Sequence, residues 1–151
     1  MKTNIKFYIA EALFKLLQNK DLNNIKVVEL AKISGTSRTT FYNNFKNIND
    51  VINYKFNLII KDINKMIKLN KLRNNNNKDL LIEILKYINK NKKTFIIIKN
   101  KLYFKFKERL DNNLNNNNYD YFIKSGIIIN LCLYYIDNNY KIDLNKIKID
   151  F

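Results

Sequence analysis

The chain has 151 residues and a formal net charge of +15, and it contains no His, one Cys and two Gly. The absence of His excludes a Ser-His-acid triad, a Cys-His pair and every zinc site with a His ligand. Two glycines far apart in the sequence cannot form a glycine-rich phosphate loop, so we expect no catalytic residue, no metal site and no cofactor.

Three short helices are predicted in the first 45 residues. The first ends with the apolar run at residues 10–17, and the second covers residues 27–33. Gly35 follows the second helix, where a tight turn between crossing helices needs a residue that reaches positive φ without a Cβ clash. Ser37 is a typical N-cap and opens the third helix. The pattern predicts a helix-turn-helix.

The third helix carries side chains that suit DNA recognition. Phe41 and Phe45 lie four residues apart and are expected to face inward. Arg38 and Asn43 then face outward, where Arg can bind guanine bidentately and Asn can pair with adenine. Hydroxyl and Lys side chains nearby can bind phosphate oxygens. The expected DNA contacts are Lys26, Ser37, Arg38, Thr39, Thr40, Tyr42, Asn43, Asn44 and Lys46.

A cluster of hydroxyl side chains marks the same region. Five of the eight Ser and Thr residues of the chain fall within residues 34–40. This cluster departs from a composition dominated by Asn, Lys, Ile and Leu, which favours a functional explanation. The alternative is a purely structural one, in which the cluster only caps a helix, because similar helix pairs also occur outside DNA-binding proteins.

A long fourth helix is expected to follow. Asn47 with Asp50 three residues later is an N-cap signature that places an acidic group near the helix N-terminus. Apolar residues then keep a spacing close to 3.6 from Val51 to about Leu69, and residues 71–78 interrupt the pattern.

Residues 9–50 resemble the N-terminal DNA-binding domain of the TetR/AcrR family of bacterial transcriptional regulators. The motifs that carry the resemblance are residues 10–17, 28–31, 35–37, 40–46 and 47–52. The resemblance implies phosphate contacts by Thr40 and Tyr42, and a fourth helix that connects the DNA-binding domain to the rest of the chain. The chain departs from the family at three positions, with Lys26 in place of Ser or Thr, Asn44 in place of an aromatic residue or His, and Ile48 in place of Lys or Ser.

The remaining chain is predicted to be helical as well. The expected helices cover residues 79–91, 94–110, 119–137 and 144–149. The stretch 121–136 is apolar on nearly every side, which indicates that it is covered from two directions. A dimer interface on one face explains this pattern, and the alternative is a core helix of a monomer. The expected interface residues are Ser125, Gly126, Ile129 and Leu133.

The C-terminal half also resembles, more weakly, a subset of TetR-like proteins that includes regulators of dihydroxyacetone kinase operons. The likeness lies in residues 85–92, 122–126 and 134–136, and it implies helical dimerisation and sensing of a protein or a small molecule. Aromatic residues in this half could line an effector pocket, and the alternative is ordinary core packing. The candidate ligand contacts are Tyr87, Tyr103 and Tyr121.

Positive charge is spread over the whole chain. Residues 1–60 carry 9 basic and 4 acidic side chains, and residues 61–151 carry 19 basic and 9 acidic ones. Because the predicted DNA-binding part is no richer in charge than the rest, much of the excess belongs to solvated helix faces. A cationic chain still binds DNA non-specifically, with a steep dependence on salt.

The expected location is the bacterial cytoplasm, in association with the nucleoid. The longest nearly apolar segment, residues 127–136, is shorter than the roughly 20 residues that a membrane span needs. The N-terminus has no cleavage-site pattern, and the single Cys allows no internal disulfide. We therefore expect no membrane partner.

Together these patterns predict an all-α protein with two parts. Residues 1–46 form a helix-turn-helix DNA-binding domain, and residues 47–151 form a helical dimerisation and effector-binding domain. The expected function is a sequence-specific transcriptional repressor that binds double-stranded DNA at a palindromic operator as a homodimer, with release by a small-molecule or protein effector. Two alternatives remain open: an architectural, nucleoid-associated DNA-binding protein with low sequence specificity, and a protein-interaction module.

Overall fold

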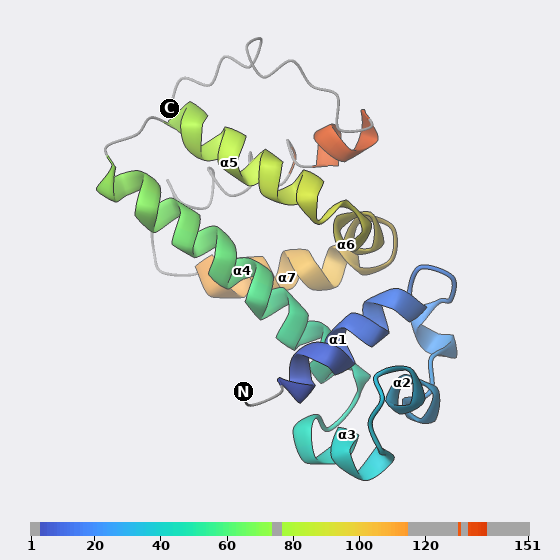
Figure 1. Ribbon diagram of the computed structural model, residues 1–151. Helices are drawn as coiled ribbons and strands as arrows, with labels where there is room; N and C mark the ends of the chain where they lie inside the picture. The colour runs from blue at the N-terminus through green and yellow to red at the C-terminus, as the bar shows by residue number, and fades with distance from the viewer. Residues whose placement is uncertain (1–3, 74–76, 115–129, 131–132, 139–151) are drawn as a thin grey trace. The chain divides into compact units, whose positions relative to one another are not determined.

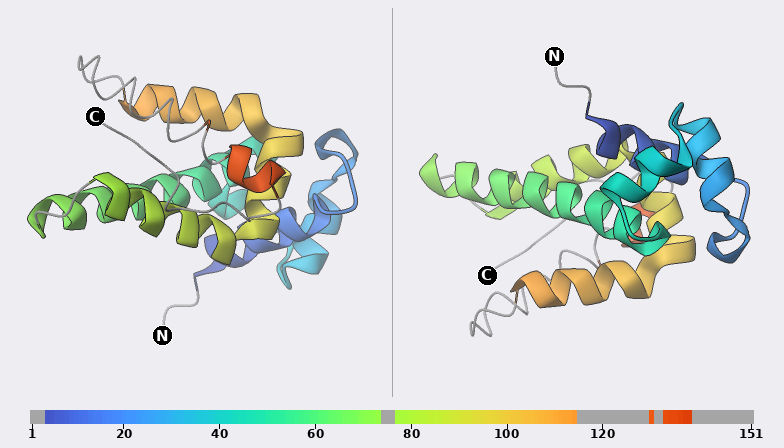
Figure 2. Two further views of the ribbon diagram at one scale, coloured as in Figure 1. Left: turned by 90° about the horizontal axis from the view of Figure 1, so that it is seen from above. Right: turned by 90° about the horizontal axis from the view of Figure 1, so that it is seen from below.

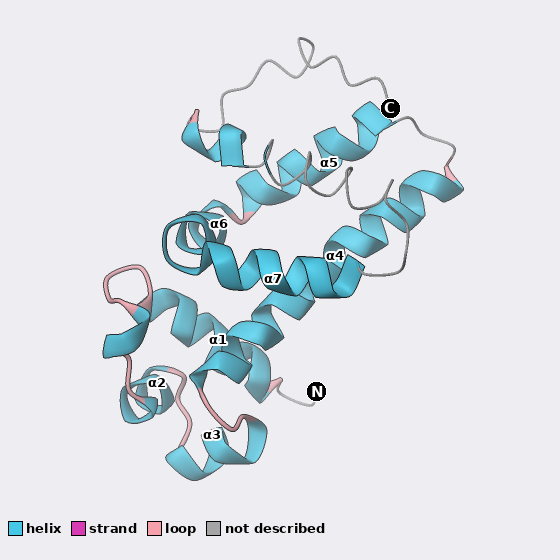
Figure 3. Cartoon of the chain, turned by 180° about the vertical axis from the view of Figure 1, so that it is seen from behind, coloured by secondary structure: helices cyan, strands magenta, loops and turns pink. Residues whose placement is uncertain are grey.

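Helices and turns make up the described part of the chain, and no strand occurs in it (Figure 1). The computed structural model describes residues 4–73, 77–114, 130 and 133–138. Figure 3 shows the same residues coloured by secondary structure. The all-α prediction is confirmed for this part of the chain. None of its helices is both long and apolar enough to cross a membrane.

The structure divides into two compact units, residues 1–59 and residues 60–151. The division falls within helix α4 (Ile48–Leu72), which begins in the first unit and ends in the second. The expected functional domains, residues 1–46 and residues 47–151, stay a prediction.

In the N-terminal unit, three helices pack against one another (Figure 2). They are α1 (Ile5–Leu16), α2 (Val27–Ile33) and α3 (Arg38–Asn44), with a short 3-10 turn at Leu22–Asn24 between α1 and α2. The second and third helices lie where the sequence pattern predicts them. The largest side chains that are fully buried in this unit are those of Ile9, Leu13, Leu17, Leu30, Phe41, Val51, Ile52 and Phe56.

Helix α4 begins at the cap that the sequence predicts. The Asp50 N–H donates to Asn47 Oδ1 at 3.0 Å, and Asp50 Oδ2 accepts the Lys46 N–H at 3.0 Å. The two residues therefore satisfy backbone donors on both sides of the helix start, and the carboxylate lies at the positive end of the helix dipole. The apolar stripe of this helix includes Phe56, which is fully buried, and Ile59.

The C-terminal unit contains the end of α4, helix α5 (Asn77–Lys90), helix α6 (Lys92–Ile97) and helix α7 (Tyr103–Leu114). Helix α5 forms because its apolar residues follow a helical spacing of three and four. The residues that it buries are Leu81, Ile84, Leu85 and Ile88. Residues 130 and 133–137 are also helical. Most of the predicted helix at 119–137, and the whole of the one at 144–149, lie outside the described residues.

One predicted helix has a different form. We expected a single helix over residues 94–110, whereas α6 and α7 are joined by a π-helical segment, Ile98–Leu102. Buried apolar residues recur here at intervals of four, at Ile98, Leu102 and Phe106. An interval of four drifts around an α-helix with 3.6 residues per turn, and a wider π turn keeps these side chains on the buried face.

Candidate nucleic-acid interface

The connection between α2 and α3 is a tight turn centred on Gly35. Gly35 has φ +67°, a left-handed conformation that carries no Cβ penalty only in glycine. Its N–H donates to the Lys32 carbonyl at 3.2 Å, and the Thr36 N–H donates to the Ala31 carbonyl at 2.9 Å. These two bonds form a Schellman motif, which satisfies the last carbonyls of α2 and reverses the chain.

Hydroxyl side chains complete this turn from both ends. Ser34 Oγ donates to the Ala31 carbonyl at 3.0 Å and lies 2.9 Å from Thr36 Oγ1. Ser37 is the N-cap of α3, and its Oγ accepts the Thr40 N–H at 3.0 Å. The hydroxyl cluster therefore caps the helix ends, which is the structural role that the alternative interpretation predicts. The same role does not prevent the exposed hydroxyls from binding a ligand.

Aromatic residues orient α3. Phe41 is 0% exposed and Phe45 is 6% exposed, and their ring centroids lie 6.0 Å apart. Ala31 of α2 is also buried, at 2% exposed. The expected inward orientation of Phe41 and Phe45 is confirmed.

The opposite face of α3 is polar and open to solvent. Arg38, Thr39 and Asn43 are exposed. Tyr42 is 51% exposed, and its ring contacts the Phe41 ring edge to face at 5.3 Å. This face therefore presents an aromatic hydroxyl together with an Arg and an Asn.

Three of the candidate DNA contacts, Ser37, Thr40 and Asn44, make local hydrogen bonds in α3 and its N-cap. Thr40 Oγ1 lies 2.9 Å from Ser37 Oγ. Asn44 Nδ2 donates to the Thr40 carbonyl at 2.8 Å, so one of its amide hydrogens is used locally. Thr40 and Asn44 are half-buried. Their hydroxyl and amide groups keep capacity for a second hydrogen bond, because a hydroxyl oxygen has two lone pairs and an amide has two hydrogens.

The remaining candidates flank the two helices. Lys26 is the N-cap of α2 with extended backbone (φ −101°, ψ 145°) and makes no side-chain capping bond. Lys46 follows α3 and is exposed. Glu29, an acidic residue of α2, forms a 2.5 Å ion pair with Lys20. Because this carboxylate is compensated by a cation, the positive charges of Lys26 and Lys46 dominate around the two helices.

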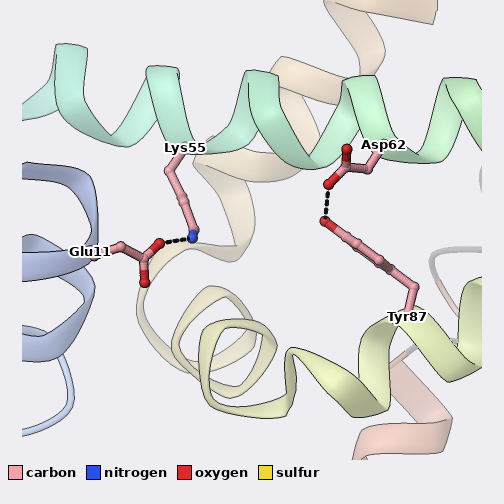
Figure 4. Close-up of polar contacts among 4 residues, drawn as sticks. All are labelled: Glu11, Lys55, Asp62 and Tyr87. Carbon is pink, nitrogen blue, oxygen red and sulfur yellow. Dashed lines mark hydrogen bonds and ion pairs between the residues drawn. The ribbon is translucent and has the colours of Figure 1, made fainter. Parts of the chain in front are cut away.

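An ion pair joins two helices of the N-terminal unit. Lys55 of α4 pairs with Glu11 of α1 (Figure 4), and its side chain is 12% exposed. The Lys55 ammonium also lies over the rings of Phe14 and Phe7, at 5.6 and 5.8 Å from their centroids. The long aliphatic stem is therefore buried on aromatic surface, and the contact ties α1 to the first half of α4.

The candidate ligand residues belong to the C-terminal unit. Tyr87 of α5 donates its hydroxyl to Asp62 Oδ2 of α4 at 3.0 Å (Figure 4), and its ring contacts the Phe95 ring edge to face at 6.0 Å. Tyr103, at the start of α7, is half-buried and packs edge to face on Phe104 at 5.3 Å. Tyr121 lies outside the described residues. A ligand role of these tyrosines stays a prediction.

The Tyr87 hydroxyl should resist ionisation. Burial, followed by the hydrogen bond to Asp62 and its negative charge, raises the pKa of Tyr87 well above its ordinary value of 10.0. The folded protein thus holds this proton more tightly than the unfolded chain does. The resulting stabilisation is complete below pH 10 and is lost as the pH rises from there toward the folded pKa.

We expect a late step in the ultraviolet titration of tyrosinate that the Tyr87→Phe variant lacks. Unfolding of the wild-type protein in denaturant provides the control, because the Tyr87 step should then return to its ordinary pKa of 10.0. If Tyr87→Phe removed an early step, the raised pKa of Tyr87 would be wrong.

The candidate dimer residues are only partly described. Ser125, Gly126 and Ile129 lie outside the described residues. Leu133 begins the helical stretch 133–137 and is half-buried. Asp137 in the same stretch pairs with Lys99 of the π-helical segment. The dimer interface therefore stays a prediction.

The chain matches no protein-family model, and a search of curated proteins finds no match either. Within the residues that the structure describes, no three His, Cys, Asp or Glu side chains lie together so as to hold a metal ion. The surface formed by α2, the Gly35 turn and α3 gathers the candidate DNA contacts.

Proposed function

We propose that this chain is a sequence-specific DNA-binding transcriptional regulator of the TetR/AcrR type, which binds a palindromic operator as a homodimer and represses transcription. The observation that carries the proposal is the pair α2 and α3 with its Gly35 turn. In this interpretation the pair is a helix-turn-helix, in which α3 is the recognition helix and enters the major groove.

The chemistry of the α3 surface supports this assignment. Arg38 and Asn43 are exposed, and these residue types read guanine and adenine in the major groove. Tyr42, Lys26 and Lys46 offer a hydroxyl and two ammonium groups, which bind phosphate and set the register of the helix on the duplex. A helix cap alone needs none of these exposed side chains, so the purely structural interpretation leaves them unexplained.

The proposed mechanism is geometric. Two recognition helices of a homodimer lie about one helical turn of DNA apart, about 34 Å, and therefore match two half-sites together. An effector that prefers a dimer with another spacing between its two DNA-binding domains shifts the population toward that form. The affinity of the dimer for its operator then falls. A dimer on a promoter represses transcription by excluding polymerase.

Selection from random duplex DNA tests this proposal. Purified full-length protein at near-physiological salt should enrich a palindrome whose half-sites are centred about 10 base pairs apart. Salt-sensitive binding without an enriched motif would favour an architectural protein. Absence of DNA binding would favour a protein-interaction module and would refute the proposal.

Substitutions on α3 should separate base reading from phosphate binding. Arg38→Ala should cost about 1 to 3 kcal/mol on the selected site and relax the preference at one position of each half-site. Lys46→Ala should weaken binding to all duplexes by a similar factor. The measurement is fluorescence anisotropy on the selected duplex and on its single-base variants.

Arg73→Ala is a matched control for these variants, because Arg73 is exposed and lies at the end of α4, away from α3 in the sequence. The Arg73→Ala variant should bind DNA with the affinity and base preference of the wild type. An equal loss of affinity on every duplex for Arg38→Ala would count against base reading by Arg38.

A further inference from the structure

Lys6 of α1 lies at the C-terminal end of α3. Its Nζ is 5.8 Å from the centroid of the Phe45 ring, and Phe45 is the C-cap residue of α3. Phe45 is buried, whereas Lys6 is exposed. The ring thus provides a fixed, electron-rich face that holds the Lys6 ammonium at the surface beside the end of α3.

Further contacts fix this arrangement. The Tyr54 ring of α4 packs edge to face on Phe45, with centroids 5.7 Å apart. The Tyr54 hydroxyl donates to Asn4 Oδ1 at 3.4 Å, and Asn4 is the N-cap of α1. The start of α1, the end of α3 and the first turns of α4 are therefore joined around one buried ring, and the backbone that carries Lys6 is held against α3.

Two lysines and one carboxylate, that of Asp50, lie near this point. Lys46 follows Phe45 directly in the chain and is exposed, so its backbone adjoins the residue whose ring the Lys6 ammonium contacts. The nearest acidic group along the chain, Asp50, accepts the backbone N–H of Lys46, and Glu11 pairs with Lys55. In the part of the chain that the structure describes, neither Lys6 nor Lys46 forms an ion pair with a carboxylate.

We propose that Lys6 and Lys46 form a two-lysine phosphate grip, which extends the DNA-binding surface from α3 onto α1. The proposal rests on the proposed function. A compact ammonium group with three donors suits a phosphate oxygen and carries no base preference. The grip therefore sets the depth and register of α3 on the duplex, while base reading stays with the exposed face of α3.

Salt dependence of DNA binding tests the grip. The slope of log Kobs against log salt is negative, and each lost phosphate contact reduces its magnitude by about 0.9. Lys6→Gln removes one contact from each protomer of the homodimer and should therefore show a slope smaller in magnitude by about 1.8 between roughly 50 and 200 mM salt, with unchanged base preference. The double variant Lys6→Gln/Lys46→Gln should lose about twice as much slope, and Lys6→Arg should keep the wild-type slope.

Lys15→Gln is the matched control, because Lys15 is exposed in the last turn of the same helix. It should bind as the wild type does. Thermal unfolding of each variant distinguishes a lost phosphate contact from a lost cation–π contact. A reduced slope for Lys6→Gln at an unchanged Tm supports the grip.

A wild-type slope for Lys6→Gln would overturn the grip and leave the proposed function intact. A changed base preference, or a reduced slope for Lys6→Arg equal to that for Lys6→Gln, would also overturn it. Failure of the wild-type protein to bind any duplex would refute the proposed function itself, and the grip with it.

Discussion

Replacing Phe41 with Ala should lower the free energy of unfolding of the N-terminal unit by about 3 to 5 kcal/mol. The Phe41 side chain is 0% exposed and packs on Phe45. Its removal loses the transfer free energy of the ring and leaves a cavity between α2 and α3, which the neighbouring side chains fill only in part. Because small domains are stable by only about 5 to 15 kcal/mol, this loss removes a large share of the stability of the unit.

Urea denaturation followed by far-ultraviolet circular dichroism measures this loss. Asn43→Ala is the matched control, since Asn43 lies two residues away on the same helix and is exposed. Its effect should stay within about 0.5 kcal/mol of the wild type. A loss below about 1 kcal/mol for Phe41→Ala would contradict the central position of this ring in the unit. DNA binding should fail together with folding in Phe41→Ala, whereas Arg38→Ala should lose affinity in a folded protein.

Insertion of about five base pairs between the two half-sites of the operator should reduce binding to the level of a single half-site. Half a helical turn moves one half-site to the opposite side of the duplex, so one recognition helix of a homodimer loses its major groove. Specific sites are typically about 10³ to 10⁷ times tighter than non-specific DNA, which sets the upper limit of the expected loss.

A duplex with a single half-site is the control for this experiment. It should bind about as weakly as the duplex with the insertion, because both offer one matched groove. If the inserted duplex kept the affinity of the intact operator, each head would bind alone, and the homodimer would have to be abandoned. The sequence-specific contacts of α3 could then still stand.

Local sequence signals predicted much of the N-terminal unit. Gly35, Ser37 and Asn47 act on backbone groups within a few residues of themselves, so their caps and turn can be recognised without knowledge of the fold. The inward side of α3 was also predictable, since a spacing of four puts Phe41 and Phe45 on one helix face. The exposed polar face of α3 followed from that orientation.

Other features depend on residues that are far apart in the chain. The Lys6 ammonium meets the Phe45 ring, and the Tyr87 hydroxyl meets Asp62, only after distant helices have packed. No periodicity within one helix encodes such a contact, so neither was predicted.

The π-helical segment Ile98–Leu102 has the same origin. Its residues carry an ordinary helical pattern. Whether they form an α turn or a π turn depends on which of their side chains are buried against the rest of the unit. Short-range hydrogen bonding and amphipathic spacing thus specified the helices and the Gly35 turn. Packing between helices decided that the Lys6 cation lies beside α3, because burial of the apolar faces of α1 and α3 brings the two helices together.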